Sequence, residues 1–196
     1  MSSSAHSSRV PIGVAAATTV ALIAFGVFAA PGSNYRMAPF FLVPLVWIVF
    51  LLRGKLHLAT AHFVLFAIAV LMHNLGALGY YQRHFAGLPF DAYVHFTFGL
   101  LGGLVAHRLI SLTMSLRPWT ERFLSVLVVM GFGALHEIME WGSTLVLGEK
   151  GMVKAEAAAN FDTQRDMFSN LLGAIVALLL VQASRGIRAG SARREH

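Results

Sequence analysis

Long apolar segments separated by short polar ones dominate this chain and restrict it to one kind of fold. Hydrophobic residues make up 57% of the 196 residues and charged residues only 12%, whereas soluble domains carry about 25% charged residues. A backbone in lipid must satisfy its hydrogen bonds internally, and no alternation of strand type is present. The sequence therefore predicts an all-α, polytopic transmembrane helical bundle of about six spans. They lie near 12–30, 38–52, 58–81, 89–112, 123–147 and 165–184.

Basic residues predict the orientation of this bundle, because Lys and Arg accumulate in cytoplasmic loops. With the N-terminus inside, ten of the 15 basic residues fall on the cytoplasmic side. These are Arg9, Arg53, Lys55, Arg108, Arg117, Arg122, Arg185, Arg188, Arg193 and Arg194. Both termini are therefore expected in the cytoplasm, with tails at 1–10 and 185–196 around one membrane domain at 11–184.

The first apolar segment also has features of a signal peptide. A Ser-rich start and Arg9 precede it, and Phe28-Ala29-Ala30 follow it. Its apolar run is longer than a usual signal core, so we expect a retained helix. The net charge of +6 lies in short loops and a tail, which favours membrane lipids over nucleic acid as partners. The oligomeric state is not indicated.

Three pairs of ionisable residues stand four positions apart in these apolar segments. Four residues make about one helical turn, so each pair projects from one helix face. An ionisable group at membrane depth costs about 3 kcal/mol and usually serves a function, with a structural polar network as the alternative. The pairs are Asp91 and His95, His136 and Glu140, and Asp162 and Asp166.

The predicted topology brings the three pairs to one side of the membrane. The first pair opens the fourth segment, the second closes the fifth, and the third leads into the sixth. His73, which closes the third segment, falls on the same outer side. Five of the nine acidic residues belong to this zone: Asp91, Glu137, Glu140, Asp162 and Asp166. The sequence therefore predicts one outward-facing polar site drawn from four helices.

A metal ion in this site would have nitrogen and oxygen ligands, because the chain has no cysteine. Such a mixed set suits zinc, manganese or iron, and it suits a proton relay equally well. The candidate ligands are His73, Asp91, His95, His136, Glu140 and Asp166. A divalent metal is thus a candidate cofactor.

The candidate catalytic residues of the site are Glu137, Glu140, Asp162 and Arg165. Spacing favours Glu140 over Glu137 as the partner of His136. Arg165 is expected to act as a counter-ion more than as a contact for an anionic headgroup. The segment from His136 to Glu140 resembles HExxH but lacks the second histidine, so no protease is inferred.

Small residues predict close contacts between helices. Gly99 and Gly103 are spaced as GxxxG, and Gly173 with Ala174 offers a similar surface. We expect ordinary helix packing at these positions. The longest outer loop, 149–161, is rich in Ala and could form a lid over the site, although a plain connector is favoured.

Four ordered motifs resemble those of the YjdF-like bacterial inner-membrane proteins across residues 40–182. They are His73-Asn74, Asp91-Ala-Tyr-Val-His95-Phe96, His136-Glu137-Ile-Met-Glu140-Trp141 and the stretch from Asp162 to Gly173. The resemblance implies a helical fold and a multi-pass location in the inner membrane, without an activity. A weaker similarity runs to the VanZ-like membrane proteins through Asp91/His95, Glu137 or Glu140, and Asp166/Asn170/Gly173.

The sequence leaves three functions open and does not decide whether the protein is an enzyme. The first is a metal-assisted hydrolase or transferase acting on a lipid or lipid-linked envelope substrate. The second is a proton-coupled carrier of small solutes, and the third is a non-catalytic envelope or lipid-binding factor. The absence of a complete hydrolase motif counts against the first, and the lack of an inverted repeat counts against the second.

Overall fold

The computed structural model describes residues 3–31, 33, 35–147 and 161–192 of the chain. Most of these residues belong to six α-helices. Five helices are long and apolar enough to cross a membrane, and the 15-residue α2 is shorter. The prediction of an all-α polytopic membrane protein is confirmed. The helices are α1 (Ser3–Val27), α2 (Ala38–Leu52), α3 (Thr60–Asn74), α4 (Phe90–Thr113), α5 (Pro118–Leu147) and α6 (Asp162–Ala192).

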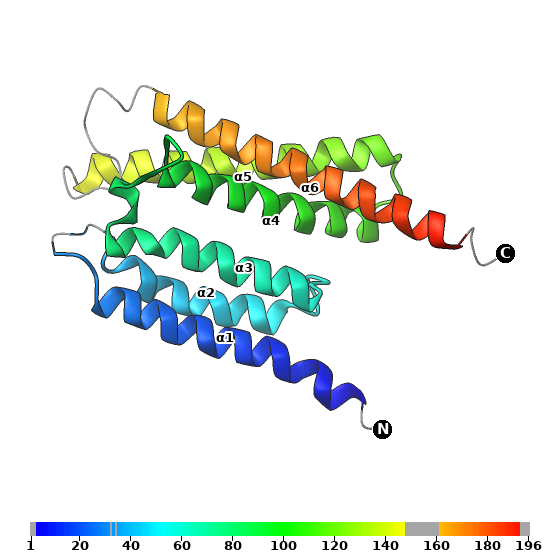
Figure 1. Cartoon of the computed structure of the whole chain (residues 1–196), viewed down its shortest axis with the longest axis horizontal. Coiled ribbons are helices and arrows are strands. Elements are labelled where there is room, and N and C mark those ends of the chain that lie inside the picture. Colours follow the sequence, from blue (N-terminus) through cyan, green and yellow to red (C-terminus); the bar gives the residue numbers. More distant parts are fainter. Residues whose placement is uncertain (1–2, 32, 34, 148–160, 193–196) are drawn as a thin grey trace.

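The helices form two groups, α1 to α3 and α4 to α6, which lie side by side (Figure 1). Leu22, Val46 and Phe63 make the buried core of the first group. In the second group α4 packs most extensively on α6, and the two groups meet where α3 contacts α4. Both termini lie at the same end of the bundle (Figure 1), as an even number of antiparallel helices requires. Which end faces the cytoplasm stays a prediction.

Several helices extend beyond the apolar segments that predicted them. Helix α1 begins at Ser3 instead of 12, α5 begins at Pro118 instead of 123, and α6 runs from Asp162 to Ala192 instead of 165–184. Hydropathy marks the part of a helix that lies in hydrocarbon, while helical hydrogen bonding continues into polar surroundings. Proline suits the first turn of α5 because its missing N–H needs no partner there.

The third predicted span, 58–81, is not one continuous α-helix. After Asn74 the chain tightens into two short 3-10 helices, η1 (Leu75–Leu78) and η2 (Tyr80–Gln82), separated by Gly79 with a φ of 83°. A hairpin of β1 (His84–Phe85) and β2 (Leu88–Pro89) then leads into α4. Ala86 and Gly87 both have positive φ, as a two-residue hairpin turn requires.

Glycines allow the backbones of α4 and α6 to touch. A Cβ atom on Gly99 would collide with the carbonyl oxygen of Asn170, and one on Gly173 would collide with that of Phe96. The GxxxG residues therefore serve packing between helices of the same chain, as expected. This contact places the first turns of α6 directly beside those of α4, where the ionisable pairs lie.

Candidate functional site

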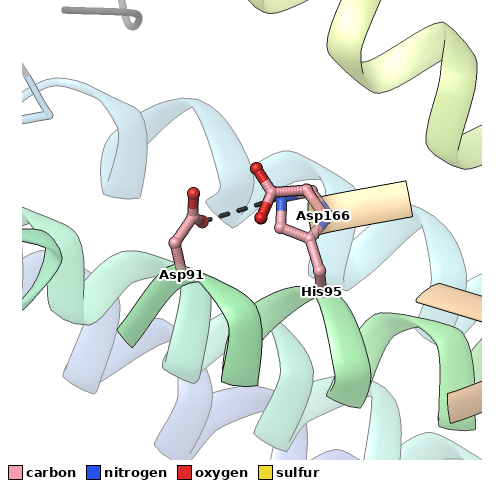
Figure 2. Close-up of side chains that lie close together, drawn as sticks. All are labelled: Asp91, His95 and Asp166. Carbon is pink, nitrogen blue, oxygen red and sulfur yellow. Dashed lines mark ion pairs between the residues drawn. The ribbon is translucent and has the colours of Figure 1, made fainter. Parts of the chain in front are cut away.

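Asp91, His95 and Asp166 form the centre of the site, the first two on α4 and the third on α6 (Figure 2). The Nε2 atom of His95 lies 3.6 Å from Asp91 Oδ1 and 3.8 Å from Asp166 Oδ2. One potential ligand atom from each residue lies within 4.8 Å of the other two. His95 and Asp166 are buried, and Asp91 is half-buried. A single turn of α4 and the close contact with α6 are sufficient to bring them together.

Glu137 from α5 adds a third carboxylate to the surroundings of His95. Its Oε1 atom lies 3.7 Å from His95 Nε2 and has no hydrogen-bond partner within the described part of the chain. The spacing argument favoured Glu140, but the structure directs both glutamates toward the cluster. Residues 136, 137 and 140 span only about 100° of a helix face, because each residue turns the helix by about 100°.

The spacing of these atoms is informative. Distances of 3.6 to 3.8 Å exceed normal hydrogen-bond lengths, which are about 2.7–3.2 Å. A metal ion with four ligands at about 2.1 Å holds neighbouring ligand atoms about 3.4 Å apart. The distances from His95 to the three carboxylates are thus close to the separation of neighbouring ligands in a tetrahedral site.

Arg165 contacts two of the same carboxylates, those of Asp91 and Asp166. It forms an ion pair with Asp162, and its guanidinium lies 3.4 Å from Asp166 Oδ1 and 3.9 Å from Asp91 Oδ2. Asp91 and Asp166 each present one oxygen to Arg165 and the other to His95. Arg165 therefore has the geometry of a counter-ion, the role that the sequence favoured. Its ion pair with Asp162 involves that carboxylate as well.

The cluster carries a formal excess of negative charge. It contains the five acids of the predicted zone and one arginine, so its formal charge is 1 − 5 = −4 with the histidines neutral. Charges at membrane depth are normally compensated. A bound cation would offset part of this excess.

His136 lies between the other two histidines of the site. Its ring centre is 5.7 Å from that of His95 and 6.0 Å from that of His73. Its Nε2 atom is 3.4 Å from Glu140 Oε1. The structure therefore brings together the residues of all four helices that the topology placed on one side.

Tyr81 is a member of the site that the sequence did not reveal, since an aromatic belt explained it equally well. Its hydroxyl lies 2.8 Å from His73 Nδ1. Burial, reinforced by the carboxylate of Asp91, raises the pKa of Tyr81 well above its ordinary value. The phenol stays protonated at neutral pH, and the donor in its hydrogen bond with Nδ1 depends on which nitrogen of His73 carries the proton.

Asn170, one turn beyond Asp166 on α6, is fully buried. The nitrogen of its side-chain amide has no hydrogen-bond partner among the described residues. A buried amide without a partner costs about 1–3 kcal/mol. The amide of Asn170 is therefore positioned to hydrogen-bond a molecule in the cavity that it lines.

A cavity of about 380 Å³ opens from the cluster into the bundle. His73, His95, His136 and Asn170 line its polar end, and apolar side chains of α2, α3, α4 and α5 line the rest. Its volume falls within the range of ligand pockets, about 300–1,000 Å³. The predicted lid at 149–161 falls almost entirely outside the described residues.

These features define a class: a multi-pass, all-helical membrane protein with a polar cluster at one end of an apolar cavity. The chain belongs to the family described as "Predicted membrane protein (DUF2238)", whose model matches residues 10–186. It is also 30% identical over 109 residues to "Inner membrane protein YjdF" of Escherichia coli (strain K12). That match covers 53% of this chain and 52% of the relative, so it spans about half of each protein.

No solved structure matches the chain. The family, the relative and the five apolar helices together identify a multi-pass protein of the inner membrane. The resemblance to the YjdF-like proteins is confirmed, and the similarity to the VanZ-like proteins stays a prediction.

Proposed function

We propose that this protein is a metal-assisted hydrolase or transferase that acts on a lipid or lipid-linked substrate within the membrane. One observation carries the proposal: His95 faces three carboxylates at distances beyond those of hydrogen bonds, and it also lines a largely apolar cavity. The ionisable groups could bind a metal and transfer protons, and the cavity has room for a hydrophobic substrate.

The metal would be held by His95 with Asp91, Glu137 and Asp166. This set of one imidazole and three carboxylates suits zinc, manganese or iron. Arg165 would orient two of the carboxylates through their second oxygens, as groups around metal ligands commonly do. A bound divalent ion polarises a carbonyl or phosphoryl oxygen and activates water.

His136 and Glu140 would transfer protons during the reaction. Glu140 lies close enough to orient the imidazole of His136, which faces the same space as His95. A histidine oriented by a carboxylate is the usual donor and acceptor of protons in acyl transfer. Asp162, a catalytic candidate from the sequence, is proposed instead to hold Arg165 in place.

Metal content tests this proposal directly. Protein purified in detergent without added metal is expected to contain about one zinc, manganese or iron ion per chain, measured by mass spectrometry of the elements. His95→Ala and Asp166→Asn should lower the occupancy by about tenfold or more, because each removes a ligand. His62→Ala, a histidine of α3 outside the cluster, should leave the occupancy unchanged.

A folded wild-type protein that contains no metal and takes up none would overturn the metal assignment. Proton flux through such a metal-free protein in vesicles would instead support a carrier. Equal metal loss in His62→Ala and His95→Ala would show that occupancy follows overall folding and not this site.

A further inference from the structure

The cavity, called the slot below, runs along the helices from the histidines toward the middle of α3, α4 and α5. On α3 its lining extends from His73 to Phe66, and on α5 from Met139 to Phe132. Seven residues of helix rise about 10 Å. One leaflet contributes about 15 Å of hydrocarbon, so the slot follows most of its depth in the direction of lipid tails.

The α5 side of the slot faces both the cavity and the surroundings of the bundle. Phe132, Leu135 and Met139 line the cavity, yet they are 61%, 51% and 65% exposed. Helix α5 packs on α4 and α6, while the opposite wall of the slot comes from α2 and α3. In a membrane the exposed side chains of α5 contact lipid, so a hydrocarbon chain can enter sideways without passing through water.

The polar end of the slot favours some chemical groups of a lipid over others. The lining residue His95 stands next to three carboxylates, and in the whole cluster five acidic groups face only one arginine. Like charges that face each other cost several kcal/mol, which disfavours a phosphate or diphosphate next to the cluster. Asn170 has an unpaired amide N–H and lines this end. A neutral ester carbonyl can accept a hydrogen bond from it.

We infer that the slot binds one acyl chain of a glycerolipid, with the ester group of that chain beside Asn170 and His95. The inference names the substrate class of the proposed function and rests on it for the reaction, although not for the binding. The apolar walls hold the chain, and the amide together with the cluster fixes the ester.

A photoreactive lipid tests this binding. The protein is reconstituted in vesicles that contain phosphatidylethanolamine with a diazirine on one acyl chain, irradiated, and mapped by peptide mass spectrometry. Labelling is expected on side chains that line the slot, such as Phe66, Phe98 and Leu101. Ala69→Phe fills the slot and should reduce this labelling at least fivefold. Ile68→Phe, on the exposed face of the same helix, should leave it unchanged.

The map of the wild-type protein decides the question even if Ala69→Phe does not fold. Labelling spread evenly over the outer faces of the helices, with none in the slot, would overturn the inference. Preferential displacement of the label by an isoprenyl phosphate would overturn the assignment to an acyl ester. Metal content is measured on the same samples. Labelling without metal would refute the proposed metal chemistry alone, and metal without labelling of the slot would refute this inference alone.

Discussion

At the scale of single residues, the site depends on side chains whose surroundings differ although their types are the same. His95 is buried among three carboxylates that stand too far away for strong hydrogen bonds. His73 shares a hydrogen bond with Tyr81, and His136 faces Glu140. The proposed function therefore gives the three imidazoles different roles: metal ligand for His95, wall of the cavity for His73 and proton carrier for His136.

The hydrogen bond between Tyr81 and His73 yields a prediction about stability. Tyr81→Phe should lower the free energy of unfolding by about 1 kcal/mol, measured by thermal unfolding in detergent near pH 7.5. Because the folded-state pKa of Tyr81 is raised, its contribution is complete below about pH 10 and decreases only at higher pH. The variant and wild type should therefore converge only in that alkaline range.

Tyr80→Phe is the matched control, since the neighbouring ring packs on Phe85 and Phe90. Equal losses in the two variants would contradict a specific role for the Tyr81 hydroxyl.

At the scale of elements, the contact between α4 and α6 determines whether the cluster exists. Gly99 and Gly173 let the two backbones approach, and His95 and Asp166 lie within one or two turns of these glycines. A separation of the helices by the width of one methyl group would move the ligand atoms apart. The packing glycines are thus part of the construction of the site.

Gly173→Ala tests this dependence. Its new methyl group would meet the backbone of α4 at Phe96, which cannot move like a side chain. We expect a loss of stability of about 1–3 kcal/mol and a weaker metal occupancy. Gly131→Ala on α5 is the control, because nothing lies within 4 Å of the added atom. It should be neutral or slightly stabilising, since alanine favours helix more than glycine. Similar losses in both variants would argue against a specific contact.

At the scale of the whole molecule, the β1–β2 hairpin between α3 and α4 lies at the end of the bundle opposite to the termini (Figure 1). The cluster lies at the hairpin end, because α4 and α6 begin there and α3 and α5 end there. If the excess of basic residues sets the orientation, this end faces outward. The cavity then lies in the outer leaflet, which determines the lipids that can reach it.

The absence of native cysteine allows a direct test of this orientation. His84→Cys in the hairpin should react with a membrane-impermeant maleimide added to intact cells. Lys55→Cys, between α2 and α3 at the other end, should react only after permeabilisation. The reverse pattern would place the cluster on the cytoplasmic side.

The sequence by itself determined the class of fold and the side of the bundle on which the polar residues gather. Both follow from simple energetics, because hydrocarbon demands apolar helices and each four-residue spacing fixes a helix face. The same reasoning placed His73, Asp91, His95, His136 and Asp166 in one zone.

Other features were decided only by the tertiary structure. The roles of Tyr81 and Glu137, the counter-ion geometry of Arg165 and the unpaired amide of Asn170 depend on the rotation and separation of packed helices. Hydropathy and residue spacing do not determine how far apart two packed helices lie or how each is rotated against the other. The cavity is likewise a property of how five helices meet, since its walls come from residues between Leu42 and Asn170. Space between helices depends on distances between surfaces that no single segment specifies.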